Sequence, residues 1–153
     1  MKRLLILLAL TGSVWAQEEL LLRLEVKSHH QTRQRALSHT VRIKSGATAS
    51  ISVSPQQRNE GIFETWRFHP TRLDDQKIRM ESQLEVRLEE GPQQQSKFSA
   101  TLLEGEPWEA ALDTPDGKAT LDYRITAWKI PTGQRLLKFD KDGRPLWVTP
   151  TNY

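Results

Sequence analysis

The four histidines are the residues of this chain best suited to bind a metal ion or to transfer protons. They are His29, His30, His39 and His69. Adjacent His29 and His30 point to opposite sides of an extended backbone, and no HExxH or similar spacing links a histidine to a carboxylate. The pattern therefore favours solvated loop histidines, and we expect no metal-binding and no cofactor-binding residues.

The sequence also gives little support for nucleophilic or acid–base catalysis. The chain has no cysteine and no Gly-x-Ser-x-Gly motif. The pairs Asp74-Asp75 and Glu89-Glu90 fall at expected strand ends, where acidic residues start turns or are solvated. Residues 140–143, Asp-Lys-Asp-Gly, resemble part of a calcium loop but lack its remaining ligands, so we expect a hairpin turn there. We expect no catalytic residues, and hence a protein that is not an enzyme.

Tryptophans are the remaining candidates for ligand contact. Four lie on expected strands: Trp66, Trp108, Trp128 and Trp147. Strand tryptophans are usually buried, but Trp128 and Trp147 fall near positions where the alternation of apolar and polar residues shifts. We therefore expect one or both to be exposed as a binding platform. Together with Ile51 and Val53 they form the predicted interaction surface.

The first sixteen residues have the three regions of a secretory signal peptide. Lys2 and Arg3 precede an apolar run over residues 4–10, and Val14-Trp15-Ala16 supplies a small-residue cleavage site. The apolar run is about half of the roughly 20 residues that a spanning helix needs. We predict cleavage after Ala16, export to the periplasm or beyond the cell, and no transmembrane segment afterwards.

Most of the positive charge belongs to this segment. The 153 residues carry 22 Lys+Arg and 19 Asp+Glu, a net charge of +3. Residues 1–16 hold two of the basic residues and no acid, so residues 17–153 carry 20 against 19, a net +1. Basic and acidic residues are interspersed there, which argues against nucleic acid as a partner. Without cysteine, this single exported domain is expected to be stabilised by packing alone.

Apolar residues in residues 17–153 recur with a period of two, the spacing of β-strands. The pattern is strongest over residues 78–88, and around a Ser45-Gly46 turn it predicts a hairpin over residues 39–53. Turn signals recur about every eight to twelve residues, and no helical period is sustained. We predict an all-β fold, an antiparallel β-sandwich of about eight or nine strands. Residues 39–53 and 78–88 are the expected edges for strand addition by a partner.

Four segments in the middle of the chain go beyond a generic strand pattern. They are residues 39–53 (HTVRIKSGATASISV), 68–70 (FHP), 73–81 (LDDQKIRME) and 98–111 (FSATLLEGEPWEAA). In this order they resemble the start of the secretin homology region of type II and type III secretion channels and type IV pilus channels. That family also shows a hairpin ending in a Gly-x-x-Ala-x-Ile-x-Val stretch, a strand leading to a proline, an acidic turn into a long amphipathic strand, and a strand ending at a glycine turn.

The resemblance covers residues 39–112, about half of the chain, and departs from the family at Ala110-Ala111, where a Gly-Gly pair often stands. It implies a secretin-like periplasmic module that docks by strand pairing or surface contact and is not a channel by itself. We therefore expect a non-enzymatic, exported structural or interaction component of a bacterial secretion or pilus assembly, with envelope proteins as partners. The alternative is a ligand-binding or chaperone-like sandwich that recognises a glycan or an unfolded peptide through exposed aromatic residues.

Overall fold

The computed structural model describes residues 18–30, 33–53, 62–88 and 91–151, which form ten strands and no helix. The strands are β1 (Glu19–His30), β2 (Arg33–Lys44), β3 (Ala49–Val53), β4 (Ile62–Arg72), β5 (Lys77–Leu88), β6 (Gln93–Leu103), β7 (Trp108–Asp113), β8 (Ala119–Lys129), β9 (Arg135–Phe139) and β10 (Pro145–Val148). Over these ranges, accordingly, no helix is present that could cross a membrane. The predicted signal peptide and the Glu89-Glu90 pair lie outside the described residues.

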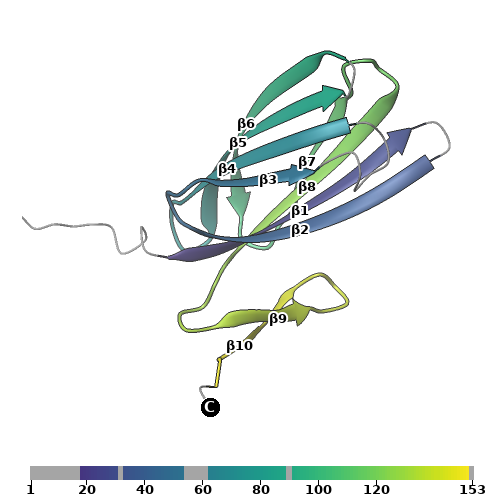
Figure 1. Cartoon of the computed structure of the whole chain (residues 1–153). Helices are drawn as coiled ribbons and strands as arrows, with labels where there is room; N and C mark the ends of the chain where they lie inside the picture. The colour runs from purple at the N-terminus through teal and green to yellow at the C-terminus, as the bar shows by residue number, and fades with distance from the viewer. Residues whose placement is uncertain (1–17, 31–32, 54–61, 89–90, 152–153) are drawn as a thin grey trace, which may run out of the picture.

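Eight of the strands form two antiparallel four-stranded sheets that pack face to face (Figure 1). Sheet A has the strand order β2-β1-β8-β7, and sheet B has the order β3-β4-β5-β6. Strands β9 and β10 form a separate hairpin, drawn below the sandwich in Figure 1. The predicted all-β antiparallel sandwich is confirmed, and the C-terminal hairpin brings the described strands to ten instead of eight or nine.

Alternate side chains of each strand fill the space between the sheets. In β5 the side chains of Ile78, Met80, Leu84 and Val86 are buried, while the intervening charged side chains face outward. Trp66 of β4 is fully buried at the centre of this core. The period-two pattern of the sequence therefore correctly predicts the buried face of these strands.

The predicted hairpin over residues 39–53 is wrong. Strand β2 pairs with β1 in sheet A, and β3 pairs with β4 in sheet B, so residues 45–48 cross from one sheet to the other. The crossing is held at both sheets, because the N–H of Ser45 donates to the Glu18 carbonyl and the N–H of Gly46 to the Pro70 carbonyl, both at 2.8 Å. Alternation reports which face of a strand is buried, but it does not report which strand lies beside it.

The predicted sheet edges are partly wrong for the same reason. Strands β2 and β3, within residues 33–53, are edge strands, but β5 lies inside sheet B between β4 and β6. Both of its backbone edges are therefore occupied by register-matched neighbours. The other two edges of the sandwich are β6 and β7.

Two turns are closed by aspartates whose carboxylates accept hydrogen bonds from nearby groups. The carboxylate of Asp74 accepts from the backbone N–H groups of Gln76 and Lys77, both at 2.8 Å, and these bonds lower its pKa. The carboxylate of Asp116 accepts from the Thr114 hydroxyl at 2.6 Å and from the N–H of Lys118 at 3.0 Å, which lowers its pKa as well. Each turn therefore favours an ionised aspartate.

We expect the protein to lose stability in acid through these turns. Because each pKa is lower in the folded than in the unfolded chain, the unfolded chain binds more protons, and stability rises with pH. The contribution is complete above the ordinary aspartate pKa of about 3.9 and is lost as the pH falls through the lower folded values. Urea unfolding at stepped pH should show a shallower acid decline in Asp116→Asn than in the wild type. Asp142→Asn, at an exposed turn position, is the control, and an unchanged slope in Asp116→Asn would contradict this account.

Candidate functional site

Trp128 and Trp147 lie in a second apolar cluster, on the outer face of sheet A. This cluster joins residues of the sandwich to the β9–β10 hairpin: Leu21, Trp128, Ile130, Leu136, Phe139 and Trp147. Trp128 is only 9% exposed, and its ring centroid lies 5.5 Å from that of Phe139. The expectation that Trp128 is exposed is therefore wrong, and Trp147 is half-buried in the same cluster. The hairpin covers this end of β8 from outside, so residues on both faces of the strand are buried and the alternation shifts there.

Ile51 and Val53 lie on β3 and face the main core. Val53 is 1% exposed, and Ile51 is half-buried against the core cluster. The four residues of the predicted interaction surface are thus divided between the outer face of sheet A and the interior side of sheet B. The structure does not bring them together on one surface.

The three histidines whose side chains are described lie apart. Nε2 of His29 lies 2.9 Å from an Asp122 carboxylate oxygen, and Nδ1 of His69 lies 3.2 Å from the Thr48 hydroxyl. Nε2 of His39 is buried and finds no hydrogen-bond partner among the described residues. In this part of the chain no group of three histidine or acidic side chains is placed to hold a metal ion.

Residues 140–143 form the predicted hairpin turn between β9 and β10. The Asp140 carboxylate accepts hydrogen bonds from the N–H groups of Asp142 and Arg144 at 2.8 and 2.9 Å. The N–H of Gly143, which has a φ of 78°, donates to the Asp140 carbonyl. One oxygen of the Asp140 carboxylate thus helps to close the turn.

The sandwich has two lateral sides where its sheets end, and the side bounded by β6 and β7 presents aromatic residues. We call it the β6–β7 side. Its half-buried apolar side chains are Phe98 and Ala100 of β6 and Trp108 and Leu112 of β7. The rings of Phe98 and Trp108 meet edge to face at 5.5 Å, and Phe98 also stacks on Trp66 at 6.2 Å. The Phe98–Trp108 pair, packed against the core through Trp66, therefore lies on the inner side of edge strand β6.

The edge of β6 is long and nearly uncharged. All eleven residues of the strand keep an uninterrupted burial alternation, and Lys97 is its only charged residue. Its C-terminal end is anchored, because the N–H of Glu104 donates to the Gln76 carbonyl and the N–H of Gly105 to the Ala127 carbonyl. The edge is therefore rigidly placed, and its outward N–H and C=O groups have no neighbouring strand among the described residues.

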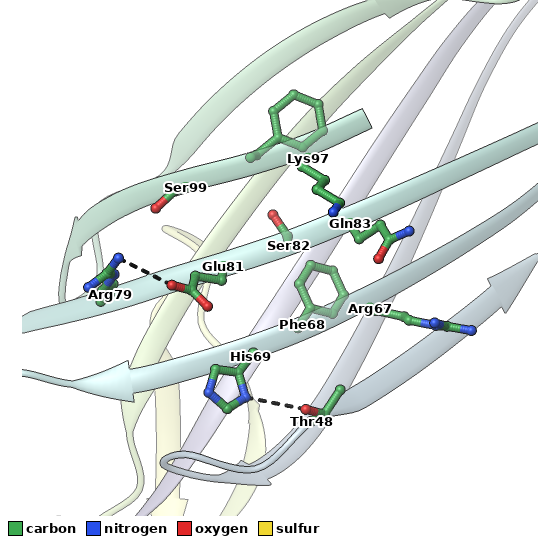
Figure 2. Close-up of a pocket in the computed structure, with 11 residues that line it drawn as sticks. Thr48, Arg67, Phe68, His69, Arg79, Glu81, Ser82, Gln83, Lys97 and Ser99 are labelled. Atoms are coloured by element: carbon green, nitrogen blue, oxygen red, sulfur yellow. Dashed lines mark hydrogen bonds and ion pairs between the residues drawn. The ribbon is translucent and has the colours of Figure 1, made fainter. Parts of the chain in front are cut away.

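A shallow groove of about 510 Å³ crosses the outer face of sheet B (Figure 2). Strand register places Arg67, Gln83 and Lys97 in one row across β4, β5 and β6. His69, Glu81 and Ser99 form the next row, in which Glu81 pairs with Arg79 at 3.2 Å. We call this the sheet-B groove.

Sequence reasoning missed both the β6–β7 side and the sheet-B groove. Phe98 and Lys97 carry ordinary strand signals, and only the assembled sheet shows that β6 is an edge. No protein-family model matches the chain, and no curated protein sequence matches it. The geometry of these two surfaces therefore carries the functional inference.

Proposed function

We propose that this chain is a non-enzymatic, exported interaction module of a bacterial envelope assembly of the secretion or pilus type, and that it binds a partner protein by strand addition to β6. The observation that carries this proposal is the uncharged edge of β6 above the Phe98–Trp108 pair. An added strand would satisfy the outward backbone groups of β6 and cover these rings. Aromatic residues in a partly desolvated setting are the usual energetic centres of interfaces.

Comparison among the edges favours β6. Strand β2 has twelve residues to the eleven of β6, but it carries four basic residues, Arg33, Arg35, Arg42 and Lys44, the kind of charge that blocks pairing with other chains. Strands β3 and β7 have only five and six residues and offer a short ladder. A long edge with a single charge is prone to aggregation unless a partner covers it, which supports a binding role for β6.

Two features of the sequence support the envelope setting. The signal-peptide pattern of residues 1–16 supports export. The resemblance of residues 39–112 to the secretin homology region supports a secretion or pilus context. Its hairpin over residues 39–53 is absent, whereas a strand reaching Pro70, an acidic turn and the long amphipathic strand β5 are present.

The surroundings of His69 give little support to catalysis, and the packed tryptophans give little support to the alternative binding role. His69 in the groove contacts a threonine hydroxyl, while the nearby Glu81 pairs with Arg79, so among the described residues no carboxylate is hydrogen-bonded to this histidine as in a catalytic dyad. The alternative function, recognition through exposed Trp128 and Trp147, loses support because Trp128 lies beneath the β9–β10 hairpin and Trp147, on β10, is half-buried in the same apolar cluster.

Site-specific photocrosslinking in cells tests the proposed function. We expect a benzophenone amino acid at Thr101, an exposed position on β6, to yield an adduct with an envelope protein, and the same probe at Thr40 on β2 to yield none. Guard charges introduced as Gln95→Lys and Ser99→Lys should lower the adduct yield about tenfold, because edge lysines oppose strand pairing. Monomer alone at every position, or equal adducts on both edges, would count against the proposal.

A further inference from the structure

The sheet-B groove carries an excess of positive charge that the chain as a whole does not. Arg67, Arg79 and Lys97 line it together with one carboxylate, Glu81, which gives a net charge of +2. Residues 17–153 together carry a net +1, so the remainder is net negative. Glu81 pairs with Arg79, while neither Arg67 nor Lys97 forms an ion pair with any described residue. The groove therefore offers two cations to a ligand from outside.

The spacing of these two cations selects an extended ligand. Arg67 and Lys97 face outward at matched positions on strands separated by β5. Adjacent strands lie about 4.8 Å apart, so the two backbone positions are about 10 Å apart. A single small anion bridges such a gap poorly, whereas a polymer with repeated carboxylates can meet both cations.

Polar side chains lie between and beside the two cations. Gln83 stands between them in the register, Ser50 lies opposite Arg67 on β3, and Ser99 flanks Lys97 on β6. Figure 2 shows the Lys97 side chain extending toward Gln83. Amide and hydroxyl groups both donate and accept hydrogen bonds, which matches the hydroxyl groups of a sugar.

A peptide fits the groove less well than a sugar polymer does. The groove crosses β4 and β5, whose backbone groups are paired with neighbours on both sides, so no strand can add there. Of the two apolar side chains in its lining, Phe68 is 1% exposed and faces the core, and Phe98 is half-buried against the core cluster. Over β4 and β5 the groove thus lacks an edge for strand addition, and its two phenylalanines are turned towards the core.

We propose that the sheet-B groove binds an acidic polysaccharide that runs across the strands, with Arg67 and Lys97 contacting successive carboxylates and Gln83 contacting the sugar between them. This site lies on the outer face of sheet B and not along the outward backbone groups of β6, although Lys97 and Ser99 belong to that strand, and it goes beyond the proposed function. It gives an envelope module a second attachment, to a uronate-type surface polymer, on a face that strand addition leaves uncovered.

Binding of alginate oligosaccharides to the purified protein, measured by isothermal calorimetry beside neutral dextran of equal length, tests this site. We expect alginate binding that weakens with salt, and a loss of affinity of about tenfold or more in Arg67→Gln/Lys97→Gln. The matched control is Lys77→Gln/Arg87→Gln, which removes the same charge from β5 outside the groove and should change affinity less than about twofold.

Several outcomes would overturn the proposal. They are absence of alginate binding, equal binding of dextran, and equal losses in the two double variants. Equal binding of poly-glutamate would also overturn it, because charge alone would then explain the affinity. Both double variants are exposed substitutions, and the crosslink at Thr101 of β6 reports separately on strand addition.

Discussion

Replacing Trp66 with alanine is expected to lower the free energy of unfolding by about 3–5 kcal/mol, the range for large aromatic residues removed from a core. Trp66 is fully buried and contacts three aromatic rings. The distance between ring centroids is 4.5 Å to Tyr123, 5.5 Å to Phe68 and 6.2 Å to Phe98. Tyr123 belongs to sheet A and the other two residues to sheet B. The substitution would therefore remove the side chain that joins the two sheets at their centre.

The same substitution should weaken the β6–β7 side, because Phe98 would lose the ring on which it stacks. Trp66→Phe is the comparison variant, since it keeps an aromatic ring and removes an indole N–H that has no hydrogen-bond partner among the described residues. Urea unfolding followed by circular dichroism should give a much higher free energy of unfolding for the wild type and Trp66→Phe than for Trp66→Ala. A loss below about 1 kcal/mol in Trp66→Ala would mean that the core collapses around the gap and that the ring is not central.

Arg72→Met is expected to cost about 2–3 kcal/mol, somewhat less than the 3–5 kcal/mol typical of a fully buried pair that loses one partner. The Arg72 side chain is 2% exposed and pairs with Glu18 and Asp75, while its Nε donates to the Asp74 carbonyl at 2.7 Å. Glu18 and Asp75 are 26% and 83% exposed, so water can solvate their carboxylates once the arginine is gone. This partial exposure is the reason for the reduced estimate.

Arg72 is important for the fold because it lies at the crossing between the two sheets. Its backbone N–H donates to the Ser45 hydroxyl at 2.9 Å, at the crossing between the sheets, and its side chain holds the segment before β1 to the β4–β5 turn. Arg79→Met is the matched control, since its ion pair with Glu81 has both side chains about half exposed and should be worth at most about 1 kcal/mol. Equal losses in the two variants by urea unfolding would refute a special role for Arg72.

Much of the fold could be predicted from the sequence because strand alternation is a local signal. The buried face of β5 follows from Ile78, Met80, Leu84 and Val86, and the turn at residues 140–143 follows from its Asp-Lys-Asp-Gly composition. Each of these features depends on residues only a few positions apart. The long strands and the sandwich class follow from the same pattern.

The candidate sites could not be predicted, because they depend on contacts between distant segments. Trp128 is covered by Phe139 and Trp147 of a hairpin that follows it in the chain, and it packs with Leu21 far before it. Arg67 and Lys97 become neighbours in one groove only when β5 is inserted between their strands. No spacing within any one segment carries this information.

The amino-acid sequence by itself determined that this is a cysteine-free all-β chain, and it determined which face of its long strands is apolar, because exposure to water imposes a period of two on every half-buried strand. Only the tertiary structure decided which strands are neighbours, which edge stays uncovered and which aromatic rings remain near the surface. The physical reason is that strand pairing satisfies backbone groups that are the same in every residue, so the choice of partner is made by packing between the sheets and not by local sequence.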